Sequence, residues 1–113
     1  MDSCLFCKII AGQIPSDKVY EDDRCYAFRD INPQAPVHIL IVPKTHVADV
    51  AECTEKDSAL AGHVLKVASE LAKREGLTNG FRLVTNAGAD ACQSVKHFHV
   101  HLLGGRKMSE KMD

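Results

Sequence analysis

Three histidines that alternate with apolar residues near the C-terminus constrain the fold of this chain more than any other feature. They are His97, His99 and His101, each followed by one apolar residue, in the segment 97–103. This period of two is typical of a β-strand, whose successive side chains point to opposite faces of a sheet. We therefore expect a strand here, with the imidazoles on one face, roughly 6.6 Å apart along the strand, and the apolar side chains on the other.

The rest of the chain predicts an α+β fold with an antiparallel sheet. A first helix is expected to have Asp2 or Ser3 as its N-cap and to end near Gly12. A longer helix is expected to start at Thr54, where the spacing to Asp57 is close to that of a capping box, and to run to about residue 76. Further strands are expected over residues 18–21, 25–29, 37–42 and 81–86. The resulting order is helix, hairpin, strand, helix, hairpin, which is typical of the α+β class.

The length and charge of the chain limit what it can do. Its 113 residues fit one domain over residues 1–113, with loosely ordered ends at 1–3 and 107–113. A net charge of −1 gives no electrostatic basis for binding nucleic acid or an anionic membrane. The sequence has no apolar run of membrane-spanning length and no signal-peptide pattern, and its five cysteines are an odd number. We therefore expect a cytoplasmic protein whose thiols are reduced or bind a metal.

The histidine row has three possible uses. Neutral imidazoles on one strand face suit zinc or copper. One imidazole can instead act as a nucleophile or general base while the others orient it. The third possibility is a surface patch without a function. Three histidines in strict alternation with apolar residues are not easily accidental, which argues against it. Spacing does not decide between the first two uses.

Polar residues around a small-residue loop are candidates for an anion site. Gln93 and Ser94 precede the histidine row, Asn86 lies upstream, and the loop 88–92 between them offers backbone N–H groups. The same residue types are common in turns, and composition alone favours that interpretation. Asp30 likewise either accepts hydrogen bonds from a ribose or caps the turn that follows it.

Cys4 and Cys7 form a Cys-x-x-Cys pair, which is a weak signal by itself. The pair is compatible with a redox motif, with half of a zinc site, or with two buried thiols. A zinc site needs two further ligands, and the histidines are the best candidates. His46 lies just after the predicted central strand, and a closed Cys₂His₂ site assembled in this way would be structural.

The histidine row and its surroundings resemble the histidine triad (HIT) family. Residues 97–103 match the pattern His-φ-His-φ-His-φ-φ of that family, in which φ is an apolar residue. Further segments resemble its Hint branch, namely residues 4–10, 14–15, 21–23, 27–36, 41–46, 93–95 and 103–106. The resemblance therefore covers nearly the whole chain.

The resemblance implies a five-stranded antiparallel sheet with two helices, and a homodimer in which two sheets form one of ten strands. It also implies a purine nucleoside phosphoramidase, which hydrolyses the P–N bond of nucleoside 5′-phosphoramidates through a covalent nucleotidyl-histidine and without an organic cofactor. The alternatives are a dinucleoside polyphosphate hydrolase, from another HIT branch, and a nucleotide-binding scaffold with incidental activity. The residues Gly104, Gly105 and Arg106 after the row favour the Hint branch.

The resemblance also assigns roles to individual residues. The middle histidine of the family, here His99, attacks the α-phosphorus. His101 contacts the phosphate and helps protonate the leaving amine, the carbonyl of His97 fixes the tautomer of His99, and His38 supports this network. The implied substrate contacts are Ser94, Gln93 and Cys92 at the phosphate, Asp30 at the ribose, Asn86 at the sugar and phosphate, and Phe6, Phe28 and Ile31 around the base.

Part of the family carries Cys-x-x-Cys near the N-terminus and binds zinc. Its ligands map onto Cys4, Cys7, His46 and His97, so the resemblance implies a structural zinc ion in this chain.

Two departures from the family pattern affect the substrate site. Cys92 stands where the Hint branch usually has a glycine whose N–H faces the phosphate. The tail, residues 107–113, lacks the Trp-Pro-Pro-Gly-like ending of eukaryotic Hint proteins. Because that ending influences leaving-group choice in the family, the resemblance leaves the leaving group of this chain open.

Overall fold

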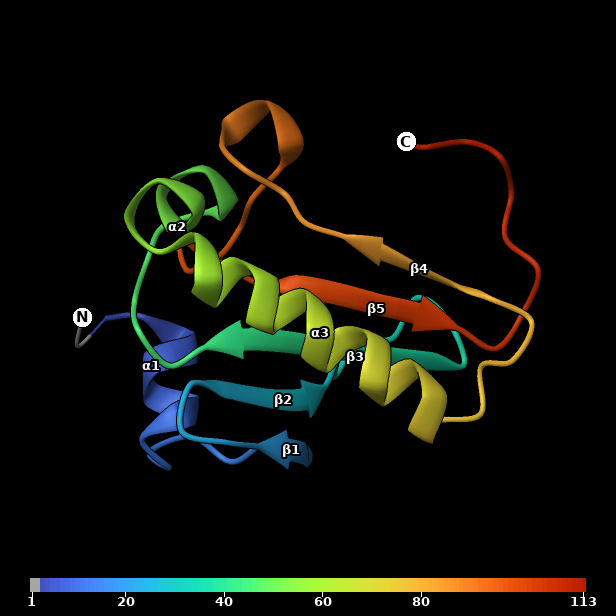
Figure 1. Cartoon of the computed structure of the whole chain (residues 1–113), viewed down its shortest axis with the longest axis horizontal. Coiled ribbons are helices and arrows are strands. Elements are labelled where there is room, and N and C mark those ends of the chain that lie inside the picture. Colours follow the sequence, from blue (N-terminus) through green and yellow to red (C-terminus); the bar gives the residue numbers. More distant parts are fainter. Residues whose placement is uncertain (1–2) are drawn as a thin grey trace.

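The chain folds as an antiparallel sheet of five strands in the order β1-β2-β3-β5-β4, with helices on both faces (Figure 1). The computed structural model describes residues 3–113. Every pair of neighbouring strands is antiparallel, as the sequence predicts for this α+β fold. The strands are β1 (Lys18–Glu21), β2 (Cys25–Arg29), β3 (Val37–Pro43), β4 (Phe81–Val84) and β5 (Val100–Gly104), and the helices are α1 (Leu5–Ile10), α2 (Val50–Lys56), α3 (Ser58–Arg74) and a short 3₁₀ turn (Ala89–Ala91).

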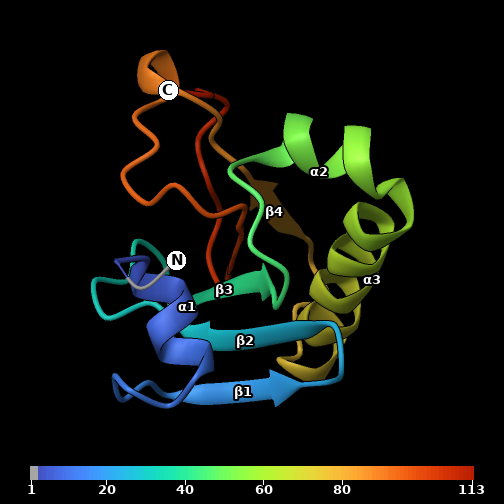
Figure 2. The same ribbon diagram turned by 90° about the vertical axis from the view of Figure 1, so that its left-hand side faces the viewer.

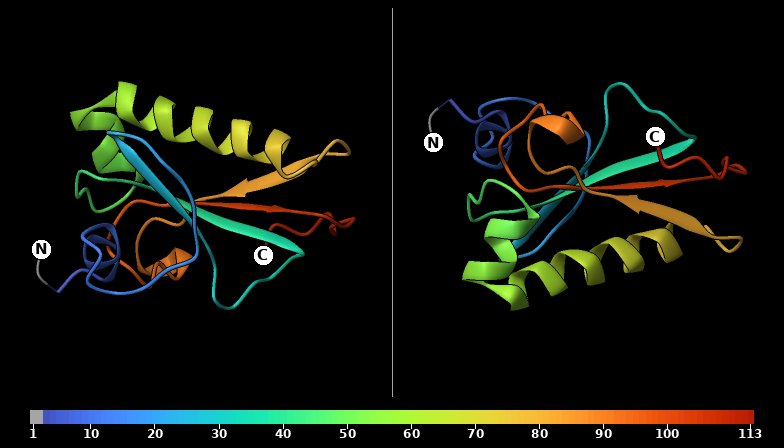
Figure 3. Two further views of the ribbon diagram at one scale, coloured as in Figure 1. Left: turned by 90° about the horizontal axis from the view of Figure 1, so that it is seen from below. Right: turned by 90° about the horizontal axis from the view of Figure 1, so that it is seen from above.

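The larger part of the core lies between the sheet and α3, which covers one face (Figure 3). Apolar residues of α3 such as Leu60, Val64 and Leu71 recur at helical spacing and are buried. They pack in one cluster with the side chains that the strands turn to that face, among them Ile39, Ile41, Phe98, Val100 and Leu102. The apolar positions of the histidine row therefore belong to this core.

The opposite face of the sheet is covered by α1 (Figure 2). Phe6 and Ile9 of this short helix are buried against a second cluster, formed by Tyr26, Phe28, Leu40 and Val42 of β2 and β3. Residues of β3 alternate between the two clusters, so this strand is buried on both faces and is the central strand that its apolar sequence predicts. The side chains of the histidine row that do not enter the α3 core lie on the α1 side.

The predicted helix starts are wrong at both helices. The N-cap of α1 is Cys4, whose Sγ accepts the N–H of Cys7 at 3.4 Å; Ser3 is not the cap, and Asp2 lies outside the described residues. The long helix does not start at Thr54, which is inside α2. It starts after Asp57, whose carboxylate accepts the N–H of Leu60 at 3.0 Å. A carboxylate is a strong N-cap acceptor, so a separate helix begins at Asp57.

The segment between β3 and α3 therefore contains a helix, α2, that the sequence did not predict as separate from the long helix. α2 has its own N-cap, Asp49, whose side chain accepts the N–H of Glu52 at 2.9 Å. The chain thus has three α-helices in residues 3–113, where the resemblance implied two.

The strand of the histidine row is shorter than predicted. β5 begins at Val100, which pairs with Ile41, so His97 and His99 precede the regular ladder. The reason is that the backbone N–H of Phe98 is donated to the carbonyl of Val47 at 2.7 Å, beyond the end of β3. Alternation nevertheless persists through the irregular part.

Several expectations about the ends and the assembly of the chain stay predictions. The tail from 107 to 113 carries no helix or strand, but the Arg82 guanidinium donates to the carbonyls of Ser109 and Lys111, at 2.8 and 3.5 Å. Residues 1–2 of the other expected loose end lie outside the described part of the chain. Within residues 3–113, no helix combines the length and apolar character needed to cross a membrane. The homodimer is taken up below.

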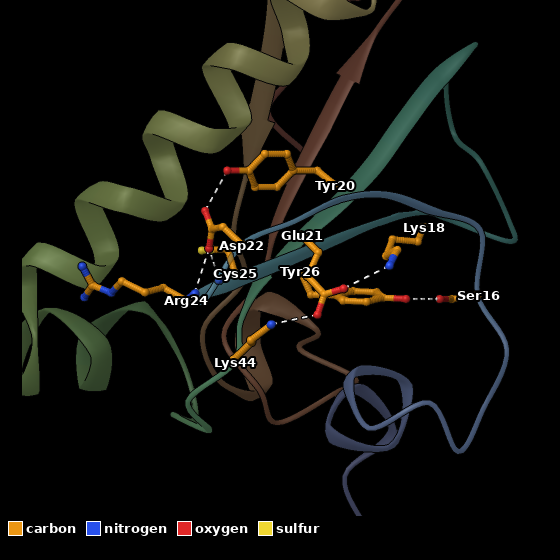
Figure 4. A network of polar contacts seen from close by, with 9 residues as sticks. All are labelled: Ser16, Lys18, Tyr20, Glu21, Asp22, Arg24, Cys25, Tyr26 and Lys44. Atoms are coloured by element: carbon orange, nitrogen blue, oxygen red, sulfur yellow. Dashed lines mark hydrogen bonds and ion pairs between the residues drawn. The ribbon is translucent and has the colours of Figure 1, made fainter.

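The β1–β2 hairpin is tied to α3 through one carboxylate, Asp22, and Figure 4 shows the contacts of this carboxylate within the hairpin. Its Oδ1 accepts the backbone N–H groups of Arg24 and Cys25, at 2.8 and 2.7 Å. Its Oδ2 accepts the Tyr20 hydroxyl and lies 2.7 Å from Nε2 of His63 on α3. Burial by itself raises the pKa of this carboxyl, but the hydrogen bonds outweigh it and hold the pKa of Asp22 well below its usual range.

Asp22→Asn is expected to lower the free energy of unfolding by about 2–3 kcal/mol, because a carboxamide cannot accept all four hydrogen bonds. The pKa of Asp22 is lower in the folded chain, so its contribution is present above the ordinary carboxyl pKa of about 3.9 and is lost as the pH falls below it. Urea unfolding of parent and variant at pH 7 and at pH 3 measures both effects. Asp23→Asn, at the exposed neighbour, is the control. Equal stability of the parent and Asp22→Asn at pH 7 would contradict this role.

Candidate active site

A cavity of about 280 Å³ lies between α1 and the sheet. We call it the α1 cavity. Its walls are mostly apolar, and at one end it is bordered by four polar side chains, Asp30, Ser94, His99 and His101. A largely apolar cavity with a few convergent polar groups is typical of a site for a small organic molecule.

His99 is held in one tautomer by the backbone. Its Nδ1 lies 2.7 Å from the carbonyl oxygen of His97, and a carbonyl can only accept a hydrogen bond. Nδ1 therefore carries the proton and Nε2 has a free lone pair. Burial lowers the pKa of His99, which keeps the ring neutral near pH 7. The edge-to-face contact with Phe6, at 5.0 Å between ring centroids, fixes the ring further.

The tautomer of His101 follows from two hydrogen bonds that start at a loop. The N–H of Gln34 donates to Nδ1 of His38 at 3.0 Å, so the proton of His38 is on Nε2. This Nε2 lies 2.9 Å from Nδ1 of His101 and 3.4 Å from Oδ2 of Asp30. His101 therefore accepts at Nδ1 and carries its own proton on Nε2. Burial, together with the neighbouring His99 and His38, lowers the pKa of His101 to about 4.

Together these two rings form a nucleophile beside a donor. The centroids of His99 and His101 are 5.1 Å apart. His99 offers the lone pair of a neutral imidazole, and His101 offers an N–H, at the end of a cavity that shields them from bulk water. Such a pair can attack an electrophilic centre and donate a hydrogen bond to a group bound to the same centre.

A second constellation lies behind the first. One donor atom each from Cys4, Cys7, His46 and His97 lies within 4.8 Å of the others. The Sγ of Cys4 is 3.4 Å from Nδ1 of His97, and the Sγ of Cys7 is 3.4 Å from Nδ1 of His46. Nε2 of His97 donates to the carbonyl of Pro43 at 2.8 Å, so its Nδ1 lone pair faces the thiols. Two sulfur and two imidazole donors are the ligand set of a structural zinc site.

The comparisons with known proteins agree with this geometry. The model of the HIT domain matches residues 11–108 of the chain. The chain belongs to the HIT family.

Three HIT proteins that are similar to this chain carry names that state a ligand or a reaction class. A 14 kDa zinc-binding protein of Zea mays is 53% identical over 107 residues, which are 93% of this chain and 84% of the relative. The solved structure of a HIT family hydrolase from Clostridium thermocellum has a TM-score of 0.94 and 46% identity, and covers 99% of this chain and 98% of that one. A histidine triad nucleotide-binding protein from Candida albicans has a TM-score of 0.82 and 35% identity, over 98% and 87% of the two chains.

The structure brings most of the sequence-predicted HIT site residues to the α1 cavity. Phe6 and Phe28 are buried in its wall, with ring centroids 5.6 Å apart. Ile31 also lines the cavity, although its side chain is fully exposed at the rim. A ligand that covers an exposed apolar side chain at the rim of a cavity removes apolar surface from water, which favours binding of that ligand. Asp30 caps its own turn, since Oδ1 accepts the N–H of Asn32 at 2.8 Å, which is the alternative that the sequence left open.

Gln93 is predicted to contact the substrate, but the structure engages its amide elsewhere. The Oε1 accepts the N–H of Gly88 at 3.0 Å, and the Nε2 donates to the carbonyls of Ala48 and Val95 at 2.7 and 3.0 Å. The buried amide therefore braces the loop before the histidine row and does not line the cavity. Its substrate contact stays a prediction.

Cys92 and Asn86 are also absent from the lining of the α1 cavity. Cys92 is exposed and has a φ of 57°, in the left-handed region that favours glycine, the residue that the resemblance leads us to expect at this position. Its N–H donates to the carbonyl of Ala89 at 3.0 Å, so this group is used within the loop instead of facing a ligand. The phosphate contacts of both residues stay predictions.

Sequence reasoning missed several residues of the site. Ile9 lies one helical turn after Phe6, so helical spacing could have placed it in the cavity wall. Gln34 sets the tautomer of His38 through a backbone N–H, and the identity of its side chain gave no signal for that. Leu5, Ile14, Pro15, Ser16, Arg29, Leu40 and Val95 also line the cavity.

Proposed function

We propose that this HIT protein is a nucleotide hydrolase that cleaves the P–N bond of purine nucleoside 5′-phosphoramidates. At the level of the family, the Clostridium hydrolase and the Candida nucleotide-binding protein support hydrolysis and nucleotide binding. The observation that carries the proposal is the pair of fixed tautomers, with the lone pair of His99 Nε2 beside the N–H of His101 Nε2. An imidazole is nucleophilic when neutral and is a good leaving group once it carries phosphorus.

The substrate is proposed to lie along the α1 cavity. Its base packs against Phe6 and Phe28, with Ile31 closing the rim. The ribose hydroxyls bind the lone pairs of the Asp30 carboxylate that the Asn32 turn leaves available. The phosphoryl group is then at the polar end of the cavity, where Ser94 and the two histidines converge.

In the first step, Nε2 of His99 attacks the α-phosphorus and the P–N bond to the amine breaks. The leaving nitrogen keeps the bonding electrons and needs one proton. The phosphoryl oxygens beside His101 favour its protonated form, in which Nδ1 also carries a proton; the proton of His38 then moves from Nε2 to Nδ1 and the hydrogen bond from Gln34 is given up. Nε2 of His101 donates its proton to the leaving nitrogen. Asp30, 3.4 Å from His38, stabilises the positive charge of the His38–His101 pair. The products are the free amine and a nucleotidyl-His99.

In the second step, water attacks the phosphorus and the bond between phosphorus and His99 breaks. The proton of the water passes to His101, which is again ready to donate. The nucleoside monophosphate leaves, and the ring of His99 returns to the tautomer that the His97 carbonyl imposes.

We propose that zinc is held by Cys4, Cys7, His46 and His97, as the zinc-binding relative and the donor set support. Four protein ligands leave no open position, so the metal is structural and activates no water. Cys4, Cys7, Cys25, Cys53 and Cys92 are free thiols in the described chain, and a reducing cytoplasm would keep the two ligand thiols available.

We also propose a homodimer that extends the sheet to ten strands. β4 is an edge strand, and its Phe81 side chain is exposed. An exposed edge with an apolar residue is suited to pairing with a second copy of the chain.

Removal of the nucleophile tests the proposed reaction. His99→Ala is expected to lower AMP release from adenosine 5′-phosphoramidate by at least about 10³-fold, because the covalent route is lost. A brief pulse of substrate on the parent should add the mass of one nucleotidyl group at His99. Lys96→Ala, at an exposed neighbour, is the control. Unchanged AMP release by His99→Ala would refute the mechanism, and faster cleavage of diadenosine polyphosphate by the parent would favour the other branch.

Metal content tests the proposed zinc site. Protein purified with zinc and reductant is expected to hold about one zinc per chain, and Cys4→Ser is expected to lose most of it, because one of four ligands is gone. Elemental mass spectrometry measures the ratio. Cys92→Ser removes an exposed thiol outside the cluster and should leave the content unchanged. Less than a tenth of an equivalent of zinc in the parent would rule out this site.

A further inference from the structure

The polar groups of the α1 cavity lie at its two ends. One end has the histidines, on and just before β5. The far end is bordered by the loop that leads from α1 to β1, where Ile14 and Ser16 line the cavity. Between the two ends lie β3 and β2, whose Leu40 and Phe28 form the apolar floor. A ligand that fills the cavity therefore meets a polar group at both ends.

The hydroxyl of Ser16 is held in place by a buried tyrosine. The Oγ of Ser16 lies 2.7 Å from the hydroxyl of Tyr26, and Figure 4 shows the two side chains pointing at each other. Tyr26 is buried beside Phe28, at 5.9 Å between ring centroids. Among the described residues, Ser16 is the one side-chain partner of this phenol.

The hydrogen bond between these two hydroxyls leaves hydrogen-bonding capacity on Ser16. Either hydroxyl can be the donor in this bond, but a buried phenol proton without an acceptor is costly, which favours Tyr26 as the donor and the Oγ of Ser16 as the acceptor. A serine hydroxyl has one donor and two acceptor lone pairs, of which this bond uses one lone pair. Ser16 therefore keeps a donor and an acceptor for the cavity, and the tyrosine limits the directions in which they point.

We propose that the Ser16 hydroxyl, positioned by Tyr26, hydrogen-bonds the polar edge of the nucleobase and makes the site selective for purines with an amino or oxo group at position 6. The inference rests on the proposed function, which puts the base between Phe6 and Phe28. The apolar part of the cavity binds any flat ring, whereas a directed hydroxyl distinguishes a base with a polar edge from one without it. Since Ser16 lies across two strands from the histidines, the longer purine reaches it better than a pyrimidine does.

The test compares two nucleotides on the same variants by titration calorimetry. One is AMP, and the other is the 5′-monophosphate of unsubstituted purine riboside, which lacks the group at position 6. A net contribution of about 1 kcal/mol for a neutral hydrogen bond corresponds to about a fivefold change in affinity. Ser16→Ala and Tyr26→Phe are expected to weaken AMP binding by about that factor and to leave the unsubstituted nucleotide within twofold of the parent.

Two further variants sharpen the comparison. Ser16→Thr keeps the hydroxyl and should retain the preference for AMP. Ser58→Ala removes an exposed hydroxyl at the start of α3 and should change neither affinity. A variant that merely misfolds would lose both nucleotides together.

The outcomes separate this inference from the proposed function. The role of Ser16 would be overturned if the parent binds AMP and Ser16→Ala keeps the parent's ratio of affinities for AMP and the unsubstituted nucleotide. The proposed function would then remain intact. A parent that binds neither nucleotide would overturn the proposed function and this inference with it.

Discussion

The hydrogen bond from Nδ1 of His99 to the carbonyl of His97 is the interaction on which the rest of the site depends. It selects the tautomer whose free nitrogen faces the α1 cavity. Because β5 begins at Val100, the carbonyl of His97 lies outside the β-ladder and is available to accept this bond. The start of β5 at Val100 is therefore part of what fixes the tautomer of His99.

His97 connects the two constellations through different atoms. Its ring is fixed by the carbonyl of Pro43 and faces the two thiols, while its backbone carbonyl orients His99. Cys7 lies on α1 and Cys4 is the N-cap of this helix, and Phe6 of the same helix contacts the rings of both His97 and His99. A helix of six residues is too short to be stable alone, so its position depends on these contacts. A metal bound by the cluster would therefore stabilise the positions of the cavity wall and of His99 together.

Sequence periodicity predicted the sheet, its central strand and the shared face of the histidines, because these depend on burial along one short segment. It failed where segments compete. Thr54 and Asp57 are both acceptable N-caps, and local spacing could not show that a helix break lies between them. The substrate contacts of Asn86 and Gln93, which the resemblance implied, stay predictions; in the structure the Gln93 amide is engaged with backbone groups of three other residues.

The spacing of residues along the sequence also could not predict contacts between residues that are far apart in the chain. His46 meets Cys7 across 39 residues, and nothing local to either residue predicts that contact. The residues alone made His46 one candidate ligand beside the cysteine pair, and the resemblance to the HIT family selected it, as it supplied the different roles of the three histidines. In the structure each ring has a different partner: the Pro43 carbonyl for His97, the His97 carbonyl for His99, and His38 for His101.

The tautomers themselves can be measured. Two-bond ¹⁵N–¹H correlation spectra of the histidine rings at pH 7 report which nitrogen of each imidazole carries the proton. The structure predicts a neutral His99 with its proton on Nδ1 and a neutral His101 with its proton on Nε2. A His99 that carries its proton on Nε2 would contradict the account, because the nitrogen facing the cavity would then have no lone pair with which to attack phosphorus.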